Sequence, residues 1–230
     1  MKTIGLIGGM SVESTAEYYR LMNQEVRSRL GPLRSAQLLL HSVDFGPIAQ
    51  AQHEGRWDDA GALLADSARR LHAAGADAIV LCTNTMHKLA GTIADATPLP
   101  FLHIADPVGE AARALGVRRL GLLATAFTME QPFLKDRLAQ AYGLDILTPD
   151  PATCAEVHRV IYEELCQGVV REASRAFYQQ AIAALQSQGC EAIVLGCTEI
   201  ALLVQQAHSP LPLLDTTALH ARAAVDFALA

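Results

Sequence analysis

Hydrophobic and polar positions divide this chain into short apolar runs and longer amphipathic segments. The apolar runs are typical of buried strands, and the amphipathic segments, with charged residues at helical spacing, are typical of helices that cover a sheet. Strands are predicted at residues 2–7, 37–42, 78–81, 101–103, 120–124, 145–147 and 192–195. Helices are predicted at residues 13–30, 57–74, 129–141, 155–166, 173–188 and 217–228. Strands that alternate with helices in this way predict an α/β fold in which parallel sheets are flanked by helices.

The second half of the chain repeats features of the first half. AIVLCTNT begins at Ala78, and AIVLGCTE begins at Ala192, 114 residues later. IGLI at residues 4–7 resembles LGLL at 120–123, and a Pro-Leu-Pro tripeptide occurs at 98–100 and again at 210–212. Three matches at nearly one offset indicate a duplication. We therefore expect two pseudo-symmetric lobes, residues 1–104 and 105–215, with a helix at 216–230 that packs back on the first lobe.

Composition and charge exclude several classes of partner. Of the 230 residues, 51% are hydrophobic and 18% are charged, which is typical of a compact globular protein and not of a disordered chain. The net charge of −6, without any run of lysine or arginine, argues against binding to nucleic acid or to an anionic membrane. The N-terminal apolar stretch is interrupted by glycines and is too short for a signal peptide or a membrane span. We therefore expect a cytoplasmic protein.

Two of the five cysteines occupy related places in the repeat. An odd number of scattered cysteines does not form a disulfide framework, and a cytosolic protein would keep them reduced. Cys82 and Cys197 each follow a predicted strand, at the carboxyl end where parallel sheets bind ligands. The other three lie within or beside predicted helices and have no partner in the repeat. We interpret Cys82 and Cys197 as functional, and the remaining thiols as structural.

Two thiols on opposite sides of one small molecule suit the inversion of a carbon centre. One thiolate would remove a proton from one face while the other thiol delivers a proton to the opposite face. Because a free thiol with a pKa near 8.5 is mostly protonated at neutral pH, nearby donors would have to stabilise the thiolate. The nearest donors in the sequence are Thr83, Asn84, Thr85 and Thr198. The alternative is that both cysteines are small buried residues at strand ends, since free cysteine is often buried.

Four stretches resemble the cofactor-independent aspartate/glutamate racemase superfamily. They are IGLIGGMS at 4–11, VLCTNTMHK at 80–88, GLLATAFTM at 121–129 and VLGCTEIALLV at 194–204. The likeness covers nearly the whole chain, and it implies two pseudo-symmetric lobes with the active site in the cleft between them. It also implies a small amino-acid substrate, no cofactor, no metal and a homodimer. Glu199 stands where glutamate racemases usually have histidine, which is closer to the aspartate racemase and broad-specificity branch.

The resemblance also assigns roles to individual residues. Cys82 and Cys197 would be the acid/base pair. The residues implied to bind the substrate are Met10, Ser11, Gln52, Asn84, Thr85, Thr125, Thr198 and Glu199. Hydroxyl and amide donors suit a carboxylate, because they can aim a hydrogen at its oxygens. The same residue types are also common in turns and helix caps, which is the structural alternative for each of them.

One segment departs from the pattern of aspartate racemases. These enzymes carry a lysine near the region equivalent to residues 161–168, where this chain reads IYEELCQG. We therefore expect that the substrate need not have an acidic side chain, and that several amino acids are accepted. Glu163 and Glu164 are interpreted as solvated helix residues. His87, five residues after Cys82, could raise the thiolate fraction of that cysteine.

Other classes of function fit less well, and two remain open. The turn GLIGG after the first strand is not the GxGxxG of a dinucleotide-binding fold, and no Cys and His residues have the spacing of a zinc site. Hydantoin racemases and maleate isomerase-type enzymes share the scaffold and the cysteines. A non-catalytic two-lobed protein that binds a small molecule would also have duplicated lobes and a polar crevice.

Overall fold

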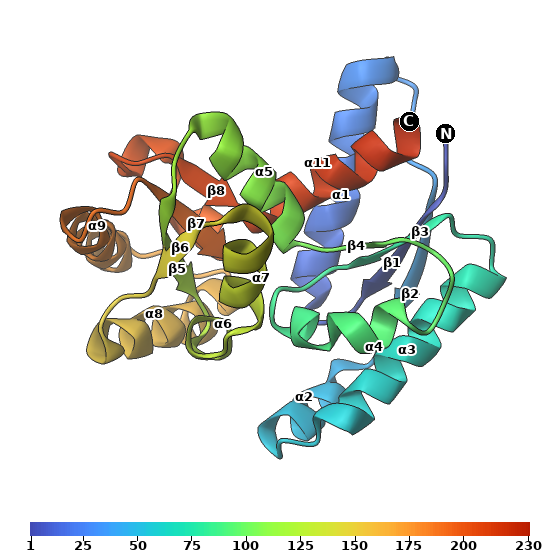
Figure 1. Ribbon diagram of the computed structural model, residues 1–230, viewed down its shortest axis with the longest axis horizontal. Coiled ribbons are helices and arrows are strands. Elements are labelled where there is room, and N and C mark those ends of the chain that lie inside the picture. The colour runs from blue at the N-terminus through green and yellow to red at the C-terminus, as the bar shows by residue number, and fades with distance from the viewer. The chain divides into compact units, whose positions relative to one another are not determined.

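The computed structural model describes residues 1–230 and contains two parallel sheets of four strands each (Figure 1). The strands of the first sheet are β1 (Ile4–Gly8), β2 (Leu38–Ser42), β3 (Ala78–Leu81) and β4 (Phe101–Leu102), in the order β2-β1-β3-β4. Those of the second are β5 (Arg119–Ala124), β6 (Asp145–Leu147), β7 (Ala192–Gly196) and β8 (Leu213–Asp215), in the equivalent order β6-β5-β7-β8. The predicted α/β fold with parallel sheets flanked by helices is confirmed.

The chain divides into two compact units, residues 1–104 with 220–230, and residues 105–219. The helices of the first unit are α1 (Val12–Leu30), α2 (Phe45–His53), α3 (Trp57–Ala73), the 3₁₀-helix η1 (Thr85–Leu89) and α4 (Ala90–Ala94). Those of the second are α5 (Ala105–Leu115), α6 (Ala126–Glu130), α7 (Phe133–Tyr142), α8 (Pro151–Glu163), η2 (Leu165–Gln167), α9 (Glu172–Ser187), α10 (Ile200–Leu203) and η3 (Gln206–His208). The last helix, α11 (Thr216–Leu229), begins in the second unit, and its residues from His220 onward belong to the first.

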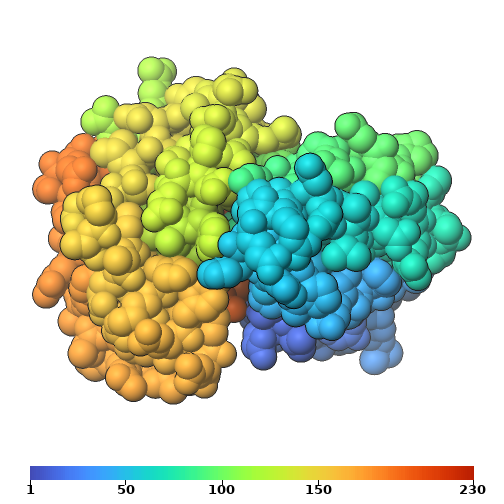
Figure 2. All heavy atoms as spheres, turned by 90° about the horizontal axis from the view of Figure 1, so that it is seen from below, coloured from blue at the N-terminus to red at the C-terminus, as the bar shows by residue number.

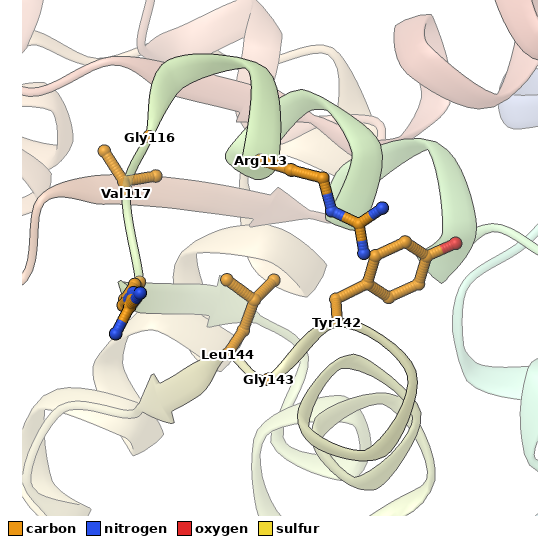
Figure 3. Close-up of a pocket in the computed structure, with 7 residues that line it drawn as sticks. Arg113, Gly116, Val117, Tyr142, Gly143 and Leu144 are labelled. Carbon is orange, nitrogen blue, oxygen red and sulfur yellow. The ribbon is translucent and has the colours of Figure 1, made fainter.

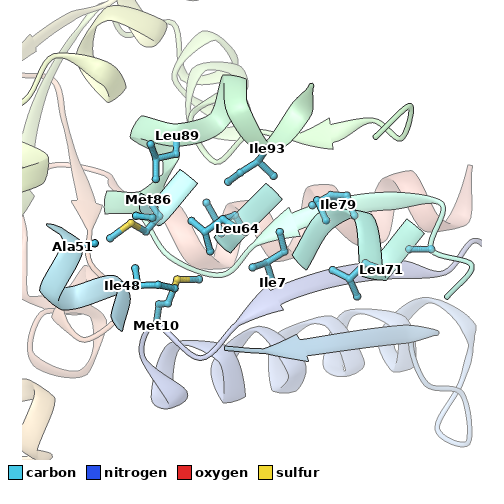
Figure 4. Packing of buried hydrophobic residues seen from close by; sticks show 14 residues of the cluster. Ile7, Met10, Ile48, Ala51, Leu64, Leu71, Ile79, Met86, Leu89 and Ile93 are labelled. Carbon is cyan, nitrogen blue, oxygen red and sulfur yellow. The ribbon is translucent and has the colours of Figure 1, made fainter. Parts of the chain in front are cut away.

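Helices cover both faces of the first sheet. Ile79 and Leu81 pack with residues of α2, α3 and α4 in one apolar cluster, which Figure 4 shows. Val80 and Cys82 lie in a second cluster with residues of α1 and α11. Successive strand residues face opposite layers, which explains why β3 is apolar without interruption. In Figure 2, α2 and α3 form part of the outer surface of this unit and are coloured cyan.

The second unit repeats the strand relationships of the first. Leu120 of β5 lies opposite Ala192 of β7, as Ile4 of β1 lies opposite Ala78 of β3. Helices α5 and α7 contact each other, as do α8 and α9, and each pair contacts strands of the sheet. None of the helices in the structure is long and apolar enough to cross a membrane.

Two predicted helices have different bounds in the structure. The single helix expected at 129–141 is divided into α6 and α7, because Pro132 restricts the preceding Gln131 to an extended conformation. Helix α8 begins four residues earlier than expected, where the Asp150 carboxylate accepts a hydrogen bond from Ala152 N and Pro151 occupies the first turn. The pattern also did not predict α2, α5 or β8, which are short or lie between stronger signals.

Candidate active site

The repeated strands β3 and β7 lead into the segments that hold most of the predicted site residues. Both are second-from-edge strands of their sheets, and their carboxyl ends lie at the edge where parallel sheets usually bind ligands. The strand register makes Ala78 equivalent to Ala192 and Leu81 equivalent to Leu195. The residue after each AIVL run is then Cys82 in the first unit and Gly196 in the second, so Cys82 is not the structural equivalent of Cys197.

Cys82 lies in the hydrophobic core of the first unit. Its exposed fraction is 0%, and it belongs to the cluster formed with Tyr18 of α1 and Ala221 of α11. Its backbone N–H donates to Ile7 O at 2.9 Å, and its carbonyl accepts from Ser14 Oγ at 2.9 Å. Burial raises the pKa of the thiol. This environment does not match the position in an open crevice that the sequence hypothesis gave to Cys82.

In the repeat, Thr83 is the residue of the first unit that aligns with Cys197 of the second. It is partly buried, and its carbonyl accepts a hydrogen bond from His87 Nδ1 at 2.7 Å. The two-cysteine hypothesis pairs Cys82 with Cys197 by residue type and treats Thr83 only as a donor near Cys82. The signal was present in the sequence, because an alignment of the two AIVL runs without a gap pairs Thr83 with Cys197.

Cys197 follows β7 in the second unit and is partly buried. Its Sγ donates a hydrogen bond to Glu199 Oε2 at 2.9 Å, and Thr198 Oγ1 donates to the same oxygen at 2.8 Å. Burial, and then the negative charge of Glu199, raise the pKa of Cys197 well above its ordinary value. The thiol is therefore held in its protonated form, with the Glu199 carboxylate as its hydrogen-bond acceptor.

Met10 and Ser11 lie in the turn from β1 to α1. Gly9 has a φ of 96° there, and a Cβ atom at this position would overlap the backbone of Val43, so only glycine fits. Met10 is 4% exposed and packs in the cluster of Figure 4. Ser11, which follows a cis peptide bond, caps α1 by accepting from Ser14 N at 3.2 Å. Both residues thus have a structural role at this edge of the sheet.

The remaining predicted binding residues fall into two groups, one in each unit. In the first, Asn84 and Thr85 follow β3, which is adjacent to β1, so they lie at the same sheet edge as Met10 and Ser11. Gln52 is on α2 and is buried. In the second unit, Thr125 follows β5 and Thr198 follows β7, and these strands are also adjacent.

His87 does not have the geometry of a base for Cys82. Its Nδ1 lies 2.7 Å from Thr83 O, and its Nε2 accepts from Ile104 N at 3.2 Å. Because a carbonyl only accepts, Nδ1 carries the proton and the ring is neutral. Burial, together with the neighbouring His103 and His220, lowers its pKa well below the ordinary range. His87 is therefore a neutral group that holds the backbone after β3 in place.

The segment that lacks the expected lysine contains a buried carboxylate. Glu163 is exposed, as the sequence analysis expected for a solvated residue. The same interpretation is wrong for Glu164, which is 2% exposed and accepts hydrogen bonds from Ser174 Oγ at 2.5 Å and Arg159 at 3.0 Å. These bonds lower the pKa of Glu164 and tie the end of α8 to α9.

A cavity of about 510 Å³ lies in the second unit, away from Cys197. Figure 3 shows Arg113 over the ring of Tyr142 at one side of this cavity, with Val117 and Leu144 at another. Val117 and Leu144 precede β5 and β6, so the cavity is at the amino edge of the sheet and not at the carboxyl edge. No group of three or more His, Cys, Asp or Glu side chains is placed to hold a metal ion.

Comparisons with known proteins agree with this scaffold. The model of the Asp/Glu/Hydantoin racemase family matches residues 7–224. A Yersinia pestis protein assigned as an Asp/Glu racemase is 50% identical, with complete coverage of both chains and a TM-score of 0.96. An aspartate racemase homologue from Pyrococcus horikoshii is 29% identical, also with complete coverage of both chains, and has a TM-score of 0.90.

More distant structures share the fold alone. The aspartate racemase of Picrophilus torridus is 18% identical, with 99% of this chain and 94% of that one covered and a TM-score of 0.77. The match of the family model, which extends from β1 to α11, confirms the resemblance seen in the sequence. The chain belongs to the Asp/Glu/Hydantoin racemase family, whose racemases are isomerases.

Proposed function

We propose that this protein racemises an amino acid at its α-carbon without pyridoxal phosphate. The observation that carries the proposal is the pairing of Cys197 with Glu199 at the carboxyl end of β7, with Sγ and Oε2 2.9 Å apart. A thiol with a carboxylate in reach can exchange a proton with a carbon acid without an organic cofactor. Membership of a racemase family gives this chemistry its context.

Glu199 supplies a route for the thiol proton. When Cys197 acts as base, the Sγ–H bond breaks and an Oε2–H bond forms on Glu199, which leaves a thiolate. The thiolate then takes the α-proton of the substrate, and Sγ–H forms again while the electron pair remains on the substrate carbon. When Cys197 acts as acid, the step begins with Glu199 protonated: the Sγ–H proton goes to the carbanion, and the Oε2–H proton then moves to the thiolate, which leaves Glu199 as a carboxylate. The raised pKa makes this thiolate a strong base once it has formed.

Inversion also needs a proton-transfer group for the opposite face of the α-carbon. The two-cysteine hypothesis gives this role to Cys82, and on that hypothesis the two bases are a matched pair of thiols. The strand register and the burial of Cys82 favour the position of Thr83 instead. We retain Cys197 as the common element of both versions, and the comparison of Cys82 with Thr83 variants separates them.

We propose aspartate and glutamate among the substrates, with neutral amino acids also accepted. The family description and its named relatives support the acidic substrates. The absence of lysine from residues 161–168 supports the broader range. Hydantoin racemisation remains a second candidate, because the family model includes hydantoin racemases.

A panel of separate L- and D-amino acids tests the proposal directly. The purified protein, without added cofactor, should reduce the optical rotation of aspartate or glutamate from either enantiomer. Activity that is lost on dialysis and restored by pyridoxal phosphate would contradict cofactor independence. Turnover of 5-substituted hydantoins alone would favour the second candidate, and saturable binding without turnover would indicate a binding protein.

Deuterium oxide distinguishes two-group from one-group transfer. With one monoprotic group for each face, the product enantiomer formed at low conversion should carry deuterium at the α-carbon, while the remaining starting enantiomer stays protiated. A single group that moves between the faces would return part of the abstracted hydrogen to the product. Mass spectrometry of the separated enantiomers measures the difference, and substantial protium in early product contradicts the two-group mechanism.

A further inference from the structure

His158 of α8 makes an unusual contact with the turn that follows β5. Its Nδ1 accepts a hydrogen bond from the backbone N–H of Ala126 at 3.2 Å. Ala126 is the first residue of α6, and Thr125, which precedes it, is one of the residues predicted to bind the substrate. The contact therefore joins a side chain of α8 directly to a segment at the carboxyl edge of the second sheet.

The hydrogen bond replaces an ordinary helix cap. The first N–H groups of a helix lack partners within the helix, and the side chain of the residue before it usually accepts from one of them. Thr125 does not do this, and its Oγ1 lies 3.3 Å from Thr128 Oγ1 instead. His158 thus supplies the acceptor from a different helix. Because Ala126 N donates to Nδ1, the neutral imidazole carries its proton on Nε2.

The imidazole ring of His158 also contacts Tyr162, one turn further along α8. The ring centroids are 4.6 Å apart, at an interplanar angle of 47°. Tyr162 is half-exposed, and its pKa is raised by burial and by the charges that Cys197, Cys166 and Glu199 can carry. In the strand register, Ala124 of β5 lies opposite Gly196 of β7, so the turn that His158 contacts leaves the sheet beside Cys197. His158 therefore touches two groups at this end of the unit, the Thr125–Ala126 turn and Tyr162.

We propose that His158 is a positioning residue for the Cys197 site, which it serves by capping α6 through Ala126 N and by supporting the ring of Tyr162. The cap fixes the direction in which Thr125 leaves β5. The ring contact restricts the rotation of Tyr162. This inference rests on the proposed racemase function, although its structural part can be measured without any activity.

Two substitutions separate the acceptor from the ring. His158→Asn keeps an oxygen that can accept from Ala126 N at the place of Nδ1, but it loses the ring. His158→Phe keeps a ring against Tyr162, but it loses the acceptor. We expect amide hydrogen exchange at residues 127–129 to be about tenfold faster in His158→Phe, with kcat/KM for racemisation reduced about tenfold, as for the loss of one hydrogen bond. His158→Asn should stay within about threefold of the unmodified protein in exchange.

Ala126→Pro removes the donor and completes a double-mutant cycle. Proline is tolerated at the first position of a helix, and Thr125, with φ −63° and ψ 156°, already has the conformation that a following proline requires. In this background His158→Phe should have no further effect on exchange at residues 127–129. Should His158→Phe fail to fold, Ala126→Pro alone is expected to reproduce the loss of protection. The exposed His72 on α3 gives the matched control His72→Phe, with no change expected.

Three outcomes would overturn the proposal. The first is an unchanged amide exchange rate at residues 127–129 in His158→Phe. The second is an equal increase of this rate in the Asn and Phe variants. The third is a full tenfold increase caused by His158→Phe in the Ala126→Pro background. If no amino acid is racemised by the unmodified protein, the proposed function fails, while the exchange measurements still decide whether His158 caps α6.

Discussion

Strands β3 and β7 share the four residues Ala-Ile-Val-Leu, but the residues that follow them differ in their chemistry. After β3, the cysteine is in the core, threonine takes the next position, and neutral His87 holds the backbone by a hydrogen bond to Thr83 O. In β7, the last residue, Gly196, takes the core position, Cys197 follows, and the carboxylate of Glu199 accepts a hydrogen bond from its thiol. A Cβ atom on Gly196 would lie 2.9 Å from the Cβ of Ala124, so the residue before Cys197 must be small.

This difference shows that a duplicated scaffold need not carry duplicated chemistry. At the end of β3 the supporting group binds main chain and is uncharged. At the end of β7 the supporting group is a carboxylate that accepts a hydrogen bond from the thiol itself. We therefore expect the second unit to be more sensitive in catalysis, and the first to be more sensitive in stability.

The largest effect is expected for Cys197→Ser. A serine hydroxyl keeps the shape but is a much weaker base, so kcat should fall about 10² to 10⁴-fold, the contribution of a positioned acid or base. Steady-state racemisation of the best amino acid measures the loss. Cys154→Ser is the matched control, because that thiol lies on α8, donates to Pro149 O and is not among the candidate site residues. More than about a tenth of the original rate would remove Cys197 from the mechanism.

The β3 end is tested by a pair of variants, Cys82→Ser and Thr83→Val. If the register assigns the reactive position correctly, Cys82→Ser lowers the free energy of unfolding by about 1–3 kcal/mol, because it buries a hydroxyl in an apolar cluster. Its turnover per folded molecule should then be nearly unchanged. Thr83→Val should reduce turnover at least tenfold, as expected when a positioned acid or base is removed.

The reverse result for this pair would restore the two-cysteine version. Inactive but stable Cys82→Ser, together with active Thr83→Val, means that the Cys82 thiol reaches the substrate. Urea unfolding and racemisation rates measured on the same samples separate the two effects.

Glu199→Gln should sharpen the contrast by changing only the β7 end. Without the carboxylate charge the pKa of Cys197 moves down toward its ordinary value, since that charge is one of its causes. The pH dependence of iodoacetamide alkylation at Cys197 should therefore shift to lower pH, and kcat should fall about tenfold as a charge-assisted hydrogen bond is lost. The exposed Glu163 provides the control Glu163→Gln. An unchanged alkylation profile contradicts the coupling of Glu199 to the thiol.

The smallest effect is expected for the loss of stability at low pH that His87 causes at the β3 end. Unfolded histidine binds a proton below about pH 6.5, whereas folded His87, with its lowered pKa, does not. The free energy of unfolding should therefore be fully retained above this pH and should decrease as the pH falls, by at most about 1.4 kcal/mol per pH unit for this group. His87→Asn, which keeps a donor for Thr83 O, should flatten the dependence in urea titrations. His72→Asn, at an exposed position, should leave the slope as it was.

Much of the fold could be predicted because the period of the hydrophobic pattern and the length of each strand are local properties of the sequence. The apolar runs at β1, β3, β5 and β7 are buried on both faces, so their composition identifies them without knowledge of their neighbours. Helix ends were less predictable. Proline at position 132 divides one expected helix, and the Asp150 cap extends another, because each depends on one backbone group finding or losing a partner.

The sequence by itself determined the duplication and the α/β class, since repeats and strand ends are readable from residue order. Only the tertiary structure decided which side of the first sheet Cys82 faces, that Glu164 is buried, and that His87 is neutral. A one-residue step along a strand reverses the face of the sheet, so two cysteines that look equivalent by type can point to opposite layers. Protonation is decided in the same way, because it follows from burial and from hydrogen-bond partners that are distant in the sequence.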